Sequence, residues 1–519
     1  MASTFFGLTI AYSGLQAANT SLTITGHNVS NINTKGYTKQ QAGTQAADAL
    51  RTHTTYGAIG SGVVVTEISQ IRDSYYDVKY RNNMANYGQY SVKESYMGQI
   101  EDYLDEFTLN GYSQEYKNFF SAVNQLTITP GDTSAKNQLI NNAKSLADYF
   151  NTLTTNLRNV QADANNEIKD AVQQINSYAK NIAALNRQIN QIEANYGNAN
   201  DLRDKRNAMI DELSEIVNLE TSEEDMGNNV SNFSVRINGQ TLVSSYSYNT
   251  LETVARTDKK NYSDAEGLYD VQWNSGQKFD MYSTSLSGHL KGLIDIRDGN
   301  NGEHENIETD DDGNNVTDSD GNLVLTTAPA ADKTVSYKGV PYYQAQLNEF
   351  AKIFSDAVNK IMKSGYTSDG GSKGISLFVT QPNTTVMSAG NITVNPELLK
   401  NADLLAIKKE QNDGESDAKI MEELNKLQSE KIFAGGTGSY FLESIVSDMS
   451  IDSQKAVNLY KNYTDLKTSI HNQRLSIMGV DTDEEAMDMI KYQQAYNLNS
   501  KMMSVMNQIY DKLINQTGI

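Results

Sequence analysis

The sequence of 519 residues contains no cysteine and only five prolines. The lack of cysteine excludes disulfide bonds, thiolate metal ligands and cysteine nucleophiles. All the prolines lie between positions 130 and 396, so both ends of the chain lack the residue that most strongly breaks helices. We therefore expect uninterrupted helices at both ends.

Positive charge is scarce, because 43 Lys and Arg residues stand against 64 Asp and Glu residues and the net charge is −21. Such a surface is repelled by nucleic-acid phosphates and by anionic lipid headgroups. The sequence also contains no apolar run of about 18 residues that could span a bilayer. We predict neither nucleic-acid binding nor membrane insertion. Residues 1–15 lack the charged and apolar parts of a secretory signal, so we expect any export to use another route.

Charged residues are absent from positions 1–34, although 21% of the whole chain is charged. Apolar residues in this segment alternate between spacings of three and four, which predicts a helix with one narrow apolar face. Polar, uncharged residues fill the other faces, which favours a helix with more than one protein neighbour. The alternative is a helix that docks only on its own domain. The apolar face consists of Leu8, Ala11, Leu15, Ala18, Leu22, Val29 and Ile32.

Residues 486–519 show two adjacent apolar rows at helical spacing. One row can bury against one neighbour, so two rows indicate at least two neighbours. We interpret this segment as a helix of a bundle or tube, and we expect both ends to become fully ordered only beside their neighbours. The first row consists of Met489, Tyr492, Tyr496, Asn499, Met503, Met506, Tyr510 and Leu513. The second row consists of Ala495, Leu498, Met502, Val505 and Ile509.

Helical periodicity also dominates the middle of the chain. The predicted helices lie near 73–106, 113–128, 134–196 (one helix or two) and 347–361, and helical spacing returns from residue 440. After Asn218 the period changes, because Phe233, Val235 and Ile237 alternate and Asn238-Gly239 is typical of a tight hairpin turn. A β-rich insert is therefore expected to begin near residue 225.

These patterns predict a mainly α fold with inserted β-rich domains, in which the terminal helices pair as a coiled coil. Residues 298–332 are acidic and rich in Gly and Asn, which favours a loop-rich excursion. The expected domains are a terminal coiled coil (1–70 plus 455–519), a helical stalk (71–224 plus 340–454), and an outer β-rich domain (225–339) that carries the acidic segment 300–336.

No motif in the sequence favours catalysis, and we predict no catalytic, cofactor or metal site. Four aspartates between positions 310 and 320 resemble part of a calcium loop, but no register aligns both the glycine and the final glutamate. The histidines are scattered, without a pair at zinc-binding spacing. Asp483, Glu484 and Glu485 stand where a helix begins, and acids at that end stabilise the helix dipole.

Several stretches resemble the axial proteins of the bacterial flagellum, a family of rod, hook and hook-associated proteins. The family's opening motif is similar to His27–Tyr37, and its closing motif is similar to Gly479–Ala486 followed by Tyr492–Tyr496. Inside the chain, Asn200–Arg206 and Gly288–Leu293 resemble stretches typical of FlgK, the first hook-associated protein. By this resemblance the sequence is identified as a member of the FlgK family.

The resemblance implies a structural protein that self-assembles at the junction between the flagellar hook and filament. It implies export from the cytoplasm by the flagellum's own type III apparatus and a final place outside the cell. The implied partners are copies of the chain in a ring or helical lattice, the hook protein, the second hook–filament junction protein and a cytoplasmic export chaperone. We assign self-assembly to the N-terminal apolar face and to the first row without Asn499, and chaperone binding to Met502, Val505, Ile509 and Leu513.

Two other interpretations stay open at this stage. In the first, the acidic region 225–440 is an adhesin or ligand-binding module displayed on the flagellum. In the second, the chain is a neighbouring axial protein, either the second junction protein or the hook protein.

Overall fold

The computed structural model describes residues 6–51, 58–109, 112–301, 303–307, 325–329, 336–368, 371–382, 384, 386–414, 416–433 and 436–515. The chain divides into two compact units. Unit 1 draws on residues 1–85, 175–250 and 463–519, and unit 2 draws on residues 86–174 and 251–462. The finer division into three domains that the sequence suggests stays a prediction.

Helices make up most of the described chain. They are α1 (Phe6–Ser30), α2 (Ser74–Leu109), α3 (Tyr112–Ile128), α4 (Thr133–Glu193), α5 (Asn200–Ile216), α6 (His289–Asp298), α7 (Val340–Ser364), α8 (Pro396–Lys400), the 3-10 helix η1 (Ala402–Leu404), α9 (Lys419–Lys426), α10 (Gly438–Met478) and α11 (Thr482–Asn515). The helices predicted at both ends and in the middle are therefore confirmed. Helix α4 is a single helix of 61 residues, since neither glycine nor proline interrupts it.

The strands form small antiparallel sheets. They are β1 (Gln40–Ala46), β2 (Leu50–Arg51), β3 (Ala58–Ile59), β4 (Val63–Gln70), β5 (Glu220–Asp225), β6 (Ser231–Ile237), β7 (Gln240–Ser244), β8 (Ser247–Tyr248), β9 (Leu251–Ala255), β10 (Tyr269–Trp273), β11 (Glu303–Ile307), β12 (Leu325–Pro329), β13 (Tyr366–Thr367), β14 (Phe378–Thr380), β15 (Ile392–Val394) and β16 (Ala406–Lys408). Strands β5 to β8 form one sheet in chain order, and the others pair as β1–β4, β2–β3, β9–β10, β11–β12, β13–β16 and β14–β15.

The hairpin predicted around Asn238-Gly239 is confirmed. Strands β6 and β7 pair across this turn, and both turn residues have positive φ, at 50° for Asn238 and 76° for Gly239. That conformation suits the right-handed twist of the two strands. The sheet begins earlier than predicted, because β5 has the sequence ETSEED and shows no apolar alternation that would reveal a strand.

Most of the predicted acidic segment 300–336 lies outside the described residues, as do the aspartates of the possible calcium loop. Its described part includes the backbone pairing of β11 with β12. The interpretation of residues 225–440 as an adhesin or ligand-binding module stays a prediction.

Unit 2 has a core of packed aromatic rings from helices α3, α4, α7 and α10, from strand β14 and from the segment between α9 and α10. Phe350 stacks on Phe433 with ring centroids 4.9 Å apart, and Phe119 lies edge-on to Phe354 at 5.7 Å. Such pairs add about 0.5–1.5 kcal/mol to the gain from burying their area. The rings of the core are Tyr116, Phe119, Phe120, Phe150, Phe350, Phe354, Phe378, Phe433 and Phe441.

Unit 2 also buries a carboxylate between two arginines at the end of α6. Asp298 accepts two hydrogen bonds from Arg297, at 3.0 and 2.6 Å, and two from Arg256, at 3.0 and 2.7 Å. The Arg297 side chain is fully buried. Burial alone would raise the pKa of Asp298, but the two guanidinium groups outweigh it and hold that pKa far below its usual range.

Replacing Asp298 with asparagine leaves two buried guanidinium groups without their shared anion. We expect Asp298→Asn to destabilise unit 2 by about 3–5 kcal/mol at neutral pH. Because the pKa is lower in the folded state, the stabilisation by Asp298 is complete above about pH 4 and is lost as the pH falls below that value. The difference in the free energy of unfolding between the variant and the unaltered chain should therefore become smaller in acid.

Urea unfolding followed by the fluorescence of Trp273, the only tryptophan, measures this difference. Trp273 is buried in unit 2. The control is Glu252→Gln, which removes an exposed carboxylate from the same unit. A gap that stays constant between pH 7 and pH 2 would contradict the assignment of the acid sensitivity to Asp298.

Candidate self-assembly interface

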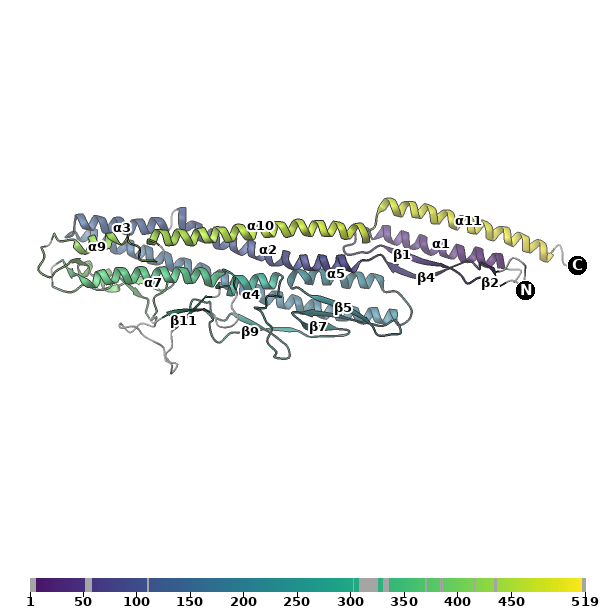
Figure 1. Cartoon of the computed structure of the whole chain (residues 1–519), viewed down its shortest axis with the longest axis horizontal. Coiled ribbons are helices and arrows are strands. Elements are labelled where there is room, and N and C mark those ends of the chain that lie inside the picture. The colour runs from purple at the N-terminus through teal and green to yellow at the C-terminus, as the bar shows by residue number, and fades with distance from the viewer. Residues whose placement is uncertain are drawn as a thin grey trace. The chain divides into compact units, whose positions relative to one another are not determined.

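Helices α1 and α11 lie side by side in unit 1 as an antiparallel pair (Figure 1). A side chain on Gly7 would overlap Met506, and a Cβ on Gly14 would lie 2.7 Å from the Asn499 Oδ1. Further along, Asn28 donates a hydrogen bond to Glu485 at 3.2 Å. The contacts thus step by seven residues along both helices, which is the repeat of a coiled coil.

The face that α1 turns toward α11 is made of small residues. Ala11, Ala18, Ser21 and Thr25 are buried there, and the glycines allow the two backbones to approach closely. The predicted N-terminal face shares only Ala11 and Ala18 with this face, because glycine, serine and asparagine do not contribute to an apolar pattern. The seven-residue spacing of Gly7, Gly14, Ser21 and Asn28 is the signal that would have revealed it. The face consists of Gly7, Ala11, Gly14, Ala18, Ser21, Thr25 and Asn28.

The other residues predicted for the N-terminal face flank this small-residue face. Leu8, Leu15, Leu22 and Val29 are half-buried in the single chain, and Ile32 is exposed beyond the end of α1. The structure therefore brings Ala11 and Ala18 into the helix pair and leaves parts of the four larger side chains accessible.

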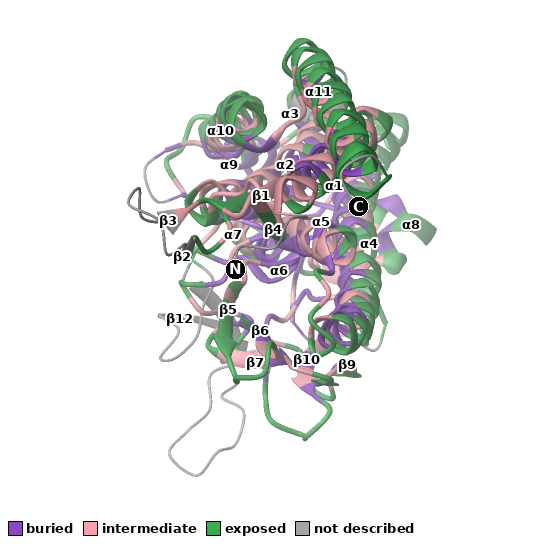
Figure 2. Cartoon of the chain, turned by 90° about the vertical axis from the view of Figure 1, so that its right-hand side faces the viewer, coloured by how far each residue is buried: buried purple, intermediate pink, exposed green. Residues whose placement is uncertain are grey.

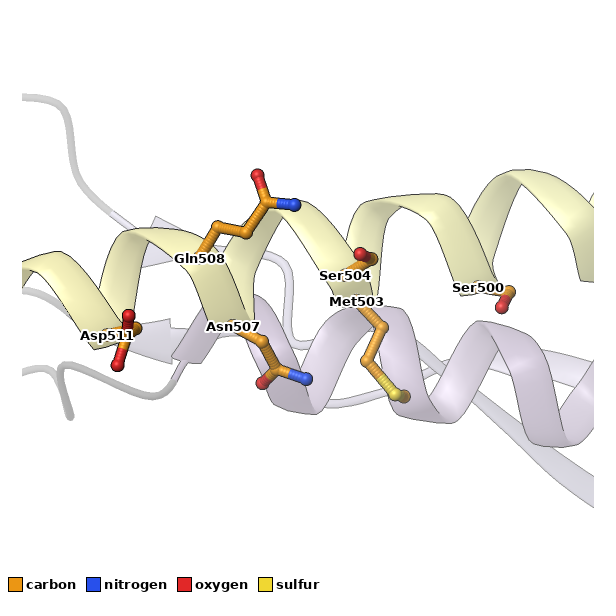
Figure 3. Close-up of a pocket in the computed structure, with 6 residues that line it drawn as sticks. All are labelled: Ser500, Met503, Ser504, Asn507, Gln508 and Asp511. Carbon is orange, nitrogen blue, oxygen red and sulfur yellow. The ribbon is translucent and has the colours of Figure 1, made fainter.

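The first row of α11 packs toward α1. Tyr510 is buried, and Tyr492, Tyr496, Asn499, Met503 and Met506 are half-buried, whereas Met489 and Leu513 at its two ends are exposed. Figure 3 shows a shallow hollow on α11 in which Met503 points toward α1 and Gln508 points away from it. One apolar row of α11 is thus covered within the chain.

The second row of α11 remains in contact with solvent. The exposed fractions are 69% for Leu498, 42% for Met502, 46% for Val505 and 45% for Ile509, whereas Ala495 is half-buried. Figure 2 shows α11 as largely exposed along its length. The four residues assigned to a chaperone are therefore accessible, since Leu513 is 46% exposed as well.

A hairpin of β1 and β4 covers another side of α1. The Val63 backbone N–H donates to the Ser13 hydroxyl at 3.2 Å, and a side chain on Gly62 would overlap that hydroxyl. Strand β4 begins directly after Gly62. Strand β1 has the sequence QQAGTQA, which lacks apolar alternation and gave no signal in the sequence.

The segment Thr38–Gln40 connects several elements at the base of the helix pair. Thr38 donates to Asp204 of α5 through its backbone N–H at 2.9 Å and through its hydroxyl at 2.7 Å. The Gln40 N–H donates to the Asn28 side chain at 3.0 Å, which ties β1 to α1. The Lys39 N–H donates to the Met478 carbonyl at the end of α10, at 2.9 Å.

The Lys39 side chain joins this segment to α11. Its Nζ lies 2.7 Å from Glu484 and 3.1 Å from Glu485, and Glu485 is buried. Burial lowers the pKa of the Lys39 ammonium, but the hydrogen bonds to the two glutamates outweigh it and leave that pKa above its usual value. Burial raises the pKa of Asp204 more than its bonds to Thr38 lower it.

Further ion pairs connect the helices of unit 1 at this base. Arg474 of α10 lies 2.8 Å from Asp77 of α2 and 2.6 Å from Asp211 of α5. Arg72 also contacts Asp77, at 2.6 Å. Because these charges are largely buried and each has a partner, removing one partner would be strongly destabilising.

Helix α11 begins with a capped first turn. The Asp481 carboxylate accepts hydrogen bonds from the backbone N–H groups of Asp483 and Glu484, at 2.9 and 3.1 Å. The predicted start of a helix at the acids 483–485 is confirmed, since all three lie in the first turn of α11. The break between α10 and α11 is the short segment Gly479–Asp481.

None of the described helices combines the length and apolar character needed to cross a membrane. In the described part of the chain, no group of three or more His, Asp or Glu residues is placed to hold a metal ion.

The described features define a mainly helical protein whose two ends pair as an antiparallel coiled coil. Residues 97–378, more than half of the chain, match the model of the helical domain of the flagellar hook-associated protein FlgK. The chain therefore belongs to the FlgK family of flagellar hook-associated proteins. This match excludes the interpretation that the chain is the second junction protein or the hook protein. Residues 471–516, which include α11, match the C-terminal model of the flagellar basal body rod FlgEFG proteins.

Full-length relatives agree with the family. Flagellar hook-associated protein 1 of Bacillus subtilis is 27% identical over 100% of this chain and 99% of its own length. The protein of the same name from Escherichia coli is 26% identical over 97% of this chain and 98% of its own length. The structure of the flagellar hook junction protein FlgK from Burkholderia pseudomallei has a TM-score of 0.60 and 14% identity, and it covers 77% of this chain and 100% of its own. That likeness shows the shared fold.

The close approach at Gly14 gives a direct test of the helix pair. Gly14→Leu should push α11 away from α1, at a cost of about 1–3 kcal/mol. The expected result is amide exchange at Tyr492–Tyr510 that is about ten-fold faster or more, measured by mass spectrometry. The control is Gly26→Leu on the same helix, since nothing lies within 4 Å of a Cβ at Gly26. Equal exchange in both variants would contradict the described packing.

Proposed function

We propose that this chain is a structural protein of the junction between the flagellar hook and filament, and that it self-assembles through its terminal helices. Membership of the FlgK family supports a place in the flagellum. A structural relative is titled a flagellar hook junction protein, which supports the finer position. The proposed role is mechanical and involves no catalytic step.

The observation that carries the proposal is the second row of α11. Fully burying a large apolar side chain contributes about 1.5–3 kcal/mol, and four such side chains of this row are exposed. The first row already packs toward α1, so the second row is available to a neighbouring molecule. Further copies of the chain, arranged in a ring or helical lattice, would bury it.

The finer partners follow from a position at the junction. The hook protein would contact the assembly on one side and the second hook–filament junction protein on the other. Before assembly, the type III apparatus would export the chain, and a cytoplasmic chaperone would cover Met502, Val505, Ile509 and Leu513. Because these residues include most of the second row, chaperone binding and self-assembly would exclude each other.

Charging the second row tests self-assembly. Leu498→Asp combined with Val505→Asp should keep the purified chain monomeric at concentrations where the unaltered chain associates, because burial of the row would then require burial of two charges. Sedimentation velocity measures the association. The control is Gln494→Asp with Gln508→Asp, which adds the same charge to exposed polar positions of α11. Unchanged association in the Leu498 and Val505 variant would argue against the row as the contact.

A bacterial strain that lacks this protein tests the place at the junction. Cells of that strain should make hooks without filaments and release flagellin into the medium, as seen by electron microscopy and immunoblotting. The unaltered chain and the Gln494 and Gln508 control should restore filaments, and the Leu498 and Val505 variant should not. Normal filaments in the absence of the protein would exclude the proposed position.

A further inference from the structure

The α1–α11 contacts repeat every seven residues and therefore do not define a unique register on their own. Gly7 faces Met506, Gly14 faces Asn499, Ser21 and Tyr492 line the same small hollow, and Asn28 bonds Glu485. A slip of seven residues, about 10 Å along the helix, would place Gly14 opposite Tyr492. Small residues of α1 would still face larger residues of α11.

The connection between α10 and α11 can supply part of the length that such a slip needs. It consists of Gly479–Asp481 and continues into the exposed first turn Thr482–Glu484. Extended chain spans at most about 3.3–3.6 Å per residue, against 1.5 Å in a helix. Fraying this first turn would therefore release about half of the 10 Å displacement, and the rest would have to come from extension of Gly479–Asp481.

Polar contacts at one end of the pair distinguish the two registers. Glu485 is buried, lies 3.1 Å from the Lys39 Nζ and accepts a bond from the Asn28 side chain at 3.2 Å. In the slipped register Glu485 would face Ser21, and the buried Lys39 and Asn28 side chains would lose this partner. A buried charge without its partner is strongly unfavourable.

We propose that Asn28, Lys39 and Glu485, here called the register cluster, set the register of the terminal helix pair. A single polar group among apolar coiled-coil contacts is the best-attested means of specifying register. Lys39 directly precedes β1 and contacts Glu485. The cluster therefore fixes the register of α11 relative to the β1–β4 hairpin as well as to α1. The inference concerns the single chain and stands apart from the junction role.

The register decides which surface a neighbour would meet. A shift of one heptad would move the second row of α11 by about 10 Å along α1. The same residues would then lie beside different parts of α1 and of the β1–β4 hairpin. This consequence rests on the proposed self-assembly, whereas the register itself does not.

Cysteine pairs can report the register, because the natural chain contains no cysteine. Gly14→Cys with Asn499→Cys reports the observed register, and Gly14→Cys with Tyr492→Cys reports the slipped one. Each pair is introduced into the full-length unaltered chain and into a chain with Lys39→Met and Glu485→Leu. Asn28 is retained, because it also bonds Gln40 and Tyr37. The rate of intramolecular disulfide formation is read from gel mobility in dilute solution.

In the unaltered chain the Asn499 pair should form its disulfide at least about ten-fold faster than the Tyr492 pair. In the Lys39 and Glu485 variant, the disulfide of the Tyr492 pair should form at least about ten-fold faster than in the unaltered chain. The control replaces another ion pair of unit 1, Lys35→Met with Glu212→Leu, whose Lys35 side chain is 81% exposed. This control should leave both rates unchanged.

Three outcomes would overturn the proposal. In the first, the Tyr492 pair stays slow in the Lys39 and Glu485 variant. In the second, the control raises its rate equally. In the third, both disulfides fail to form in the variant while circular dichroism shows retained helix. The cluster would then be needed for pairing itself rather than for choosing the register.

Discussion

Helix α11 presents two apolar rows, and α1 covers one of them. The small side chains on the facing side of α1 let the two backbones come close, so the first row is partly buried by a slender partner helix. The second row of α11 stays exposed beside this close pairing.

Apolar and polar contacts have different roles in this part of the chain. The apolar rows select which face of α11 meets α1, but such contacts are non-directional and tolerate sliding. Hydrogen bonds and ion pairs require specific distances, and the segment Thr38–Gln40 makes them to four different helices. The position of the helix pair on the rest of unit 1 thus depends on three consecutive residues at the point where the chain enters strand β1.

The sequence revealed those features whose signal is local and periodic. The two rows of α11, the helical character of residues 134–196 and the Asn238-Gly239 turn are such features. The small-residue face of α1 was missed because glycine contributes nothing to an apolar pattern. Strands β1 and β5 were missed because they are polar on both faces. The contacts of Arg474 join residues almost 400 positions apart, and no local pattern in a single sequence encodes such a pairing.

The distribution of charge supports assembly through the terminal pair. The whole chain carries a net charge of −21, but positions 1–34 contain no charged residue. Beyond its first turn, α11 carries both signs, with Lys491, Lys501 and Lys512 opposing Asp488 and Asp511. Repulsion between exposed charges decays over about 8 Å at physiological salt. In the proposed assembly, two copies can therefore bring their terminal helices within contact distance with little repulsion at the contact, and burial of the apolar second row, which acts only at short range, would hold them together.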